Sequence, residues 1–374
     1  MKVSMSIESA LKKDGIVVIK KMDTLKVNSI ARIISSKICE TFPHLDLSQN
    51  ELFIKLSRLD MYIANMPKGM SEASYFYKNS SIYFNSSIDE DNIEGIAIHE
   101  CIHYLQAIKD KKNYLLKMGL CDYTEFRVYG LALNEAAVQL MTSKIVGEPK
   151  DYVKYFNISF ETNSSLYYPL ECCLVNQLSY ITGENILFDS TLKSNDDFKF
   201  KLADLIGRKA FMSIQASLDN ILSMEEKIIK INNKIAQIDD RNKKVDNMIT
   251  KIDNLKRSIS NEFFKTQNLI ITSYFDREFE KTSTIEELNE YRRNLYSFKD
   301  YLASTDGYTF FNDYYVDKMM MLEQKYNFME NGEYTSETQI LPRKYSKFLA
   351  IIGFIRNLVK LNNSEKENRK SENN

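Results

Sequence analysis

The residues best placed to do chemistry lie in the stretch IEGIAIHECIHYLQ, at positions 93–106. His99 and His103 are four residues apart, so on an α-helix both imidazoles project from one face, one turn apart. Two imidazoles in this arrangement can bind one metal ion, and Glu100, about 100° around the helix, can reach a water molecule beside that ion. The chain has only 3 histidines, which makes a chance match uncommon. The pattern predicts a metal site with His99 and His103 as ligands and Glu100 as general base.

The residues around the motif favour a helix with one buried face. Ser87 followed by Glu90 has the spacing of a capping box before the helix. An apolar stripe is expected on the side away from the histidines, formed by Ile98, Cys101, Ile102 and Leu105. The alternative interpretation is a core helix whose two histidines bind no metal.

A third ligand is expected from a second helix, predicted from about Asp122 to Gly147. Glu135 lies on it, 32 residues after His103, which leaves enough chain for the second helix to cross the first. A carboxylate there would complete a His/His/Glu set and leave a fourth position to water, as a catalytic zinc requires. The alternative is a Glu135 that faces solvent like many helix glutamates.

The triplet Asn134-Glu135-Ala136, with the His-Glu-x-x-His motif before it, resembles the metal-binding helices of gluzincins. These are the zincin metallopeptidases that include thermolysin-like peptidases and clostridial neurotoxin light chains. The resemblance covers the chain from about Leu59 to Gly147, and more loosely to Ala216. It implies one catalytic zinc ion (Zn²⁺), bound by His99, His103 and Glu135.

The sequence departs from that family in two ways. The interval between His103 and Glu135 is longer than in thermolysin-like enzymes. Four residues after Glu135 stands Gln139, where those enzymes have an acidic residue. Gln139 can still accept a hydrogen bond from a ligating imidazole, although it adds no negative charge to the site.

The resemblance also implies a cleft between a small sheet and later helices. The strand-like runs at 15–20 (GIVVIK) and 59–66, and the aromatic hairpin around Asn79 and Ser80, match the order of the amino-terminal half of zincins. Residues 81–86 would then be the edge strand that binds an extended peptide, or else a plain hairpin that covers the core. Residues 152–216 read as mostly helical. Because many zincins supply an oxyanion donor from this part, Tyr167 and Tyr168 are the candidates, with Tyr168 preferred.

Composition excludes several classes of protein. A formal net charge of −1 gives no basic field for nucleic acid. There is no apolar stretch of about 18 residues to cross a membrane and no secretory signal. The 5 cysteines form no Cys-x-x-Cys pair, so neither a disulfide framework nor a thiolate zinc site is expected. These features favour a cytoplasmic protein, with non-classical export left open.

From Leu218 onward the apolar residues alternate at spacings of three and four. The pattern predicts a long coiled-coil helix at 217–265, about 65 Å if unbroken, with Asn242 and Lys256 in its two polar core positions. Its partner could be a second copy, a later helix of the same chain or another protein. The alternative is a long helix packed along the catalytic domain.

The fold expected is therefore an α+β zincin-like catalytic domain at 1–216, with a small mixed or antiparallel sheet packed on the motif helix. The coiled-coil helix at 217–265 follows it, then a helical region at 266–361 and a disordered tail at 362–374. The helix at 343–361 carries basic residues around an apolar middle. Packing against the protein is favoured for it over contact with a membrane surface.

Three functions fit these features. The first is a zinc endopeptidase acting on peptide or protein substrates. The second is a non-catalytic coiled-coil scaffold or regulator that carries a zincin-like domain. The third is a fold stabilised by zinc, with no water-accessible position on the metal.

Overall fold

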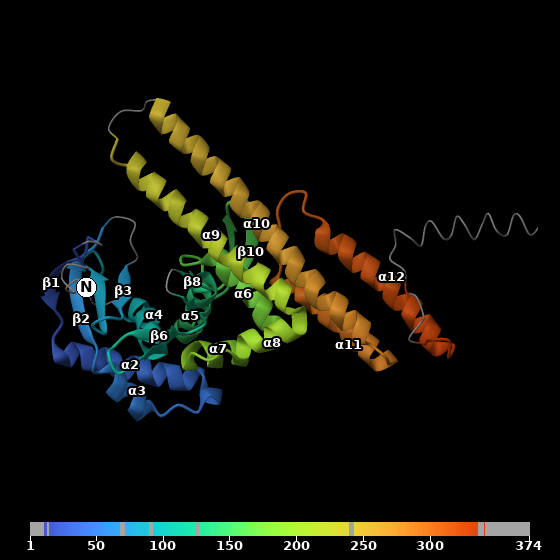
Figure 1. The fold of residues 1–374 in the computed structure, drawn as a ribbon, viewed down its shortest axis with the longest axis horizontal. Coiled ribbons are helices and arrows are strands. Elements are labelled where there is room, and N and C mark those ends of the chain that lie inside the picture. Colours follow the sequence, from blue (N-terminus) through green and yellow to red (C-terminus); the bar gives the residue numbers. More distant parts are fainter. Residues whose placement is uncertain are drawn as a thin grey trace, which may run out of the picture. The chain divides into compact units, whose positions relative to one another are not determined.

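The computed structural model describes residues 11–12, 15–67, 72–89, 93–124, 127–238, 243–335 and 340. They form a mixed α and β protein that is mainly helical and contains small sheets (Figure 1). The chain divides into two compact units: the first reaches Tyr274 and includes Asp300–Asp306, and the second holds Phe275–Lys299 and the residues from Gly307. The expected capping residue Glu90, the helix at 343–361 and the tail at 362–374 lie outside the described residues.

A four-stranded sheet begins the first unit, with its strands in the order β1-β2-β4-β3. The strands are β1 (Val17–Lys21), β2 (Asp60–Asn65), β3 (Ala73–Phe76) and β4 (Ser81–Asn85). β2 and β4 are parallel, whereas β1 and β3 each pair with a neighbour in the antiparallel sense. The sheet is therefore mixed.

The expectation that residues 81–86 form the edge strand is wrong. β4 lies between β2 and β3, and its register pairs Asp60 with Ser81 on one side and Phe76 with Ser81 on the other. The outer strand on this side is β3. The run Ile82, Tyr83 and Phe84 is buried, as in a strand covered on both faces, and such continuously apolar strands are typical of the interior of a sheet rather than its edge.

Helices pack beside this sheet. They are α2 (Thr24–Thr41), the short helix η1 (Pro43–Leu45), α3 (Gln49–Leu56) and α4 (Ile93–Gln106). α2 begins where the Asp23 side chain accepts a hydrogen bond from the backbone N–H of Lys26. α4 carries the histidine motif. The whole apolar stripe expected on it is buried, which confirms Ile98, Cys101, Ile102 and Leu105 as its core face.

The helix that carries Glu135 starts later than expected. Two short hairpins occupy the preceding residues, made of β5 (Ala107–Lys109), β6 (Leu115–Met118), β7 (Asp122–Tyr123) and β8 (Val128–Tyr129). α5 (Leu131–Val146) then begins after Gly130, whose φ of 73° lies in the left-handed region that favours glycine. Its end at Gly147 agrees with the prediction.

A β-hairpin also occupies part of the segment expected to be helical. β9 (Asp151–Tyr155) and β10 (Ile158–Thr162) pair through a turn at Phe156 and Asn157, and both turn residues have positive φ. Burial of Ile158, Phe160 and Thr162 shows the two-residue period of a strand. Helices follow: α6 (Pro169–Thr182), α7 (Glu184–Lys193) and α8 (Asp197–Ile206).

The expected single coiled-coil helix is two helices, α9 (Arg208–Ile235) and α10 (Lys243–Lys281). They run side by side in opposite directions (Figure 1), and Ser217 donates a hydrogen bond to Glu262 across them at 2.6 Å. The apolar seam is thus paired within one chain. It includes buried residues of both helices: Ile221, Met224, Ile228, Val245, Ile252, Ile259 and Phe263. Asn242 lies outside the described residues, and Lys256 is half-buried on α10.

The sequence between α9 and α10 contains neither glycine nor proline. Ile235 ends α9, and residues 239–244 read DDRNKK. A heptad pattern keeps its phase through such a stretch, so periodicity alone does not separate one long helix from a hairpin of two.

The second unit is formed by the end of α10 with α11 (Ile285–Phe298) and α12 (Phe310–Glu330). The short helix η3 (Lys299–Tyr301) lies at the unit boundary. The aromatic core of the second unit contains Phe275, Phe279, Tyr291 and Phe298. Buried Lys325 donates to the carbonyl of Phe279, near the end of α10. In the part of the chain described, no helix is long and apolar enough to cross a membrane.

Candidate metal centre

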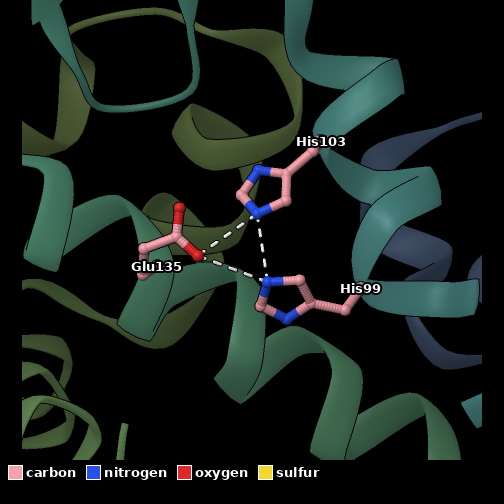
Figure 2. A group of neighbouring side chains, drawn as sticks. All are labelled: His99, His103 and Glu135. Carbon is pink, nitrogen blue, oxygen red and sulfur yellow. Dashed lines mark hydrogen bonds and ion pairs between the residues drawn. The ribbon is translucent and has the colours of Figure 1, made fainter. Parts of the chain in front are cut away.

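Two helices bring three ligand atoms to one point. His99 and His103 project from one face of α4, and Glu135 reaches them from α5 (Figure 2). The two imidazole Nε2 atoms are 3.0 Å apart, and each lies 3.3 Å from the same carboxylate oxygen, Oε2 of Glu135. The structure therefore joins the three residues that the sequence singled out.

This triangle has the size that zinc requires. In tetrahedral zinc sites the nitrogen and oxygen ligands lie about 2.0–2.1 Å from the metal, which puts neighbouring ligand atoms about 3.3 Å apart. The three distances here are 3.0, 3.3 and 3.3 Å. A His/His/Glu donor set is also the set that leaves one position of a catalytic zinc to solvent. The residues present fit a zinc ion.

Both imidazoles are oriented through their other ring nitrogen. Nδ1 of His103 lies 3.2 Å from Oε1 of Gln106, whose amide nitrogen donates to the carbonyl of Thr191 and to the side-chain oxygen of Asn134. Those two acceptors determine which way the Gln106 amide points, so Nδ1 of His103 must be the donor. Its Nε2 then presents a lone pair to the centre of the triangle.

Gln139 orients the imidazole of His99 in the same way. Its Oε1 lies 3.1 Å from Nδ1 of His99, and its amide nitrogen lies 3.3 Å from the Ser143 hydroxyl. Gln139 is the partner that the sequence predicts for a ligating imidazole. With both Nδ1 atoms as donors, two lone pairs and a carboxylate face one another, an arrangement that only a positive charge between them stabilises.

The electrostatics of the cluster point the same way. Burial by itself would lower the pKa of His103, but the adjacent Glu135 carboxylate raises it to about 9. Burial would raise the pKa of Glu135, yet the two imidazoles hold it well below its usual range. The cluster favours a bound cation, and in the absence of a metal a proton can take that place.

Glu100 lies beside the cluster and is hydrogen-bonded to the backbone of the outer strand β3. Its Oε2 accepts a hydrogen bond of 2.6 Å from the backbone N–H of Tyr75 on β3. Among the described residues its other oxygen has no hydrogen-bond partner. That oxygen can therefore accept a proton from a water molecule.

The two candidate tyrosines have different positions. Tyr168 precedes α6 with a φ of 50°, and its ring stacks on that of His99 with centroids 6.2 Å apart. The Glu135 carboxylate and burial raise the pKa of Tyr168 well above its usual value, so its hydroxyl is a neutral donor. The Tyr167 hydroxyl instead donates to Glu72, just before β3. The structure thus brings Tyr168, and not Tyr167, to the centre.

Asp219 positions the helix that carries Glu135, and sequence reasoning missed it. Its two carboxylate oxygens accept hydrogen bonds from the backbone N–H groups of Gly130 and Ala132, at 2.8 and 3.0 Å. The α5 amino terminus is therefore capped from α9, across more than 80 residues of chain. Gly130 has a φ of 73°, and a Cβ there would also lie 2.4 Å from the Gln215 side-chain amide, so the junction favours a glycine chiefly through its backbone conformation.

Gln106 was missed as well, although a signal existed. It follows His103 by three residues on the same helix, a spacing at which side chains contact. Asn134 completes its network by accepting from the backbone N–H of Leu120 at 3.0 Å. A Cβ on Gly119 would lie 1.9 Å from the Asn134 side-chain oxygen, which explains a glycine beside this buried network.

A separate buried acidic pair lies outside the centre. Glu171 on α6 and Glu225 on α9 are both buried, and neither forms an ion pair with any described residue. Burial, and for Glu225 the nearby Glu171, raises the pKa of both carboxyls. Tyr155 lies next to the pair, and its own pKa is raised by burial and by the two carboxyls. The pair therefore holds at least one proton at neutral pH.

Comparison of the chain with known proteins finds no relative. A scan of the chain against protein-family models gives no match, and the searches of curated proteins and of solved structures also find none.

Proposed function

We propose that the protein is a zinc-dependent endopeptidase. The observation that carries the proposal is the triangle of His99, His103 and Glu135, with both imidazoles oriented from behind by glutamine oxygens. A zincin-type catalytic domain is proposed on the same ground, together with the resemblance of the two ligand-bearing stretches to those of gluzincins.

Each residue has a role in this mechanism. Zinc in such a site supplies Lewis acidity, which acidifies water and polarises a carbonyl. His99, His103 and Glu135 hold the ion, while Gln106 and Gln139 keep the imidazoles in the ligating tautomer.

Glu100 takes the proton from the attacking water on its open oxygen and passes it to the leaving amine. Its hydrogen bond to the backbone of Tyr75 fixes the carboxylate in place while this proton moves. Tyr168, next to Glu135, is the proposed donor to the oxyanion that forms on the scissile carbonyl.

A peptide is the proposed substrate because the base lies against the edge of a sheet. β3 is the outermost strand, and Glu100 contacts its backbone at Tyr75. An extended peptide can add to such an edge through main-chain hydrogen bonds, which would align a peptide bond with the base.

The test compares substitutions on one helix. Glu100→Gln should retain one zinc per chain and lose hydrolysis of a peptide library by at least about 100-fold, as expected when a general base is removed. His103→Ala should lose both zinc and hydrolysis. Glu94→Gln, on the same helix, is the matched control and should keep both. Zinc is measured by elemental analysis and cleavage by mass spectrometry, with and without chelator.

Two outcomes would overturn the proposal. One is full hydrolysis by a folded Glu100→Gln protein. The other is stoichiometric zinc without cleavage of any library peptide, which would indicate a zinc-stabilised fold or a scaffold.

A further inference from the structure

A hollow of about 820 Å³ lies between the β9–β10 hairpin and α10, within the first unit. We name it the basic groove after its three cationic residues, Lys154 on β9 and Lys256 and Arg257 on α10. Its remaining lining consists of Phe156, Asn157, Asp253, Ser260, Asn261 and Thr305.

The positive charge of the groove is not neutralised. In the part of the chain that the structure describes, no carboxylate forms an ion pair with Lys154, Lys256 or Arg257. Among the described residues, the hydrogen-bond partners of Arg257 are neutral oxygens on its own helix, the Asp253 carbonyl and the Asn254 side-chain amide. Asp253 is the one acidic residue in the lining. Three cationic residues and one anionic residue line this concave surface, and such an excess of positive charge attracts an anionic ligand, less strongly as salt rises.

Lys256 is in a place where packing alone would favour an apolar residue. It continues the seam of buried Ile252 and Ile259, yet it is a half-buried lysine. An apolar residue here would extend the seam, whereas the lysine leaves a polar opening at the groove.

The turn on the other side of the groove is also unusual. Phe156 and Asn157 have φ values of 51° and 65°. Asparagine tolerates this region, but a phenylalanine rarely adopts it, because its Cβ then lies too close to the backbone. The turn places Phe156 in the lining of the groove, and its ring packs on that of Tyr155 with centroids 4.1 Å apart, so Phe156 can offer an apolar contact to a ligand.

We infer that the basic groove binds an acidic segment of a polypeptide, namely a part of the protein substrate away from the scissile bond. This rests on the proposed function. Carboxylates complement the three cations, Phe156 suits an apolar side chain, and the polar groups of Asn157, Ser260 and Asn261 suit a peptide backbone. The volume suits several residues of chain rather than one phosphate, because pockets of roughly 300–1,000 Å³ hold drug-sized ligands.

The chain's own carboxy-terminal segment does not complement the groove. Residues 341–374 contain more lysine and arginine than aspartate and glutamate. A basic segment and a basic groove repel each other, so the occupant is expected to come from another molecule.

The binding test uses the full-length protein with chelator present, so that no cleavage occurs. The probe is a fluorescein-labelled 12-residue peptide of alternating Glu and Leu, and its binding is followed by fluorescence anisotropy. We expect affinity that falls with salt, and a loss of at least about 10-fold in the double variant Lys256→Glu/Arg257→Glu. Lys251→Glu, an exposed charge reversal on the same helix outside the groove, should bind like the unmodified protein.

Three results would overturn the inference. They are equal binding of a peptide with Gln in place of Glu, unchanged binding by the double variant, and binding of phosphatidylserine vesicles without any binding of the peptide. Circular dichroism of the double variant checks that it is folded.

A kinetic test separates this inference from the proposed function. A short neutral peptide that the protein cleaves is compared with the same peptide extended by the Glu-Leu sequence. The double variant should cleave the short peptide normally, and its KM for the extended one should rise about 10-fold with kcat unchanged. Binding of the probe without hydrolysis of any peptide would support the basic groove as an acidic-peptide site and contradict the proposed peptidase function. If the double variant and the unmodified protein have the same KM for the extended peptide, the groove does not bind that part of the substrate.

Discussion

Replacing Gln139 by leucine isolates the contribution of one hydrogen bond to the proposed zinc site. The side chain is buried, and its oxygen is the partner of Nδ1 of His99 at 3.1 Å. Leucine has a similar volume but no acceptor, so a buried N–H donor would be left unsatisfied at a cost of about 1–3 kcal/mol. His99 could avoid this cost by moving its proton to Nε2, the ligand atom. Zinc binding would then have to reverse that shift.

The expected result is a roughly 10- to 100-fold loss of zinc affinity, which corresponds to about 1.4–2.7 kcal/mol. Affinity is measured by competition with a chromophoric chelator, and folding by circular dichroism. Gln139→Glu should bind zinc at least as tightly as the unmodified protein, because a carboxylate forms the stronger, charge-assisted bond to an imidazole.

Ser143→Ala is the matched control, since it removes only the second partner of Gln139. Its zinc affinity should stay within about threefold of the unmodified protein, because the bond to His99 remains. Zinc affinity of a folded Gln139→Leu protein within twofold of the unmodified one would refute the reasoning. Equal damage by Ser143→Ala would show that packing, rather than the imidazole bond, is responsible.

Two further predictions concern the cap of α5 and the buried acidic pair. Asp219→Ala removes two charge-assisted hydrogen bonds from the α5 amino terminus and should lower the free energy of unfolding by about 2–4 kcal/mol in urea titrations. Glu226→Ala, which breaks only an exposed pair on the same helix, should cost under about 0.5 kcal/mol, and similar losses in the two variants would contradict the capping role. The raised pKa values of Glu171 and Glu225 mean that the folded protein keeps protons which the unfolded chain releases above about pH 4.5, so stability should fall as pH rises beyond that value. Glu225→Gln should flatten this slope between pH 6 and 9, and an unchanged slope in urea titrations would show that the pair is not its source.

Local patterns were sufficient for the elements whose signal lies within one turn or one strand. The apolar stripe of α4 predicted both the helix and its buried face, because neighbours at three and four residues share a face whatever the rest of the chain does. The strands β1, β2, β3 and β4 were recognisable for a similar reason, since β-branched and aromatic runs favour extended backbone.

Predictions failed where another part of the chain decides the outcome. The start of α5 at Leu131 depends on the left-handed Gly130 and on Asp219, a cap from α9. The order of β3 and β4 in the sheet depends on which strand pairs with β2, and spacing along the chain contains no such information. The hairpin of α9 and α10 was missed because a continuous heptad phase is compatible with one helix or with two.

For the candidate metal centre, the sequence by itself determined which residues could act as ligands: His99 and His103 on one helical face, and Glu135 by its surrounding triplet. Only the tertiary structure decided that the carboxylate meets both imidazoles, and that Gln106 and Gln139 orient them. The physical reason is one of distance. Backbone periodicity relates side chains a few residues apart, whereas the crossing of two helices is set by the packing of their buried faces and by caps from remote residues.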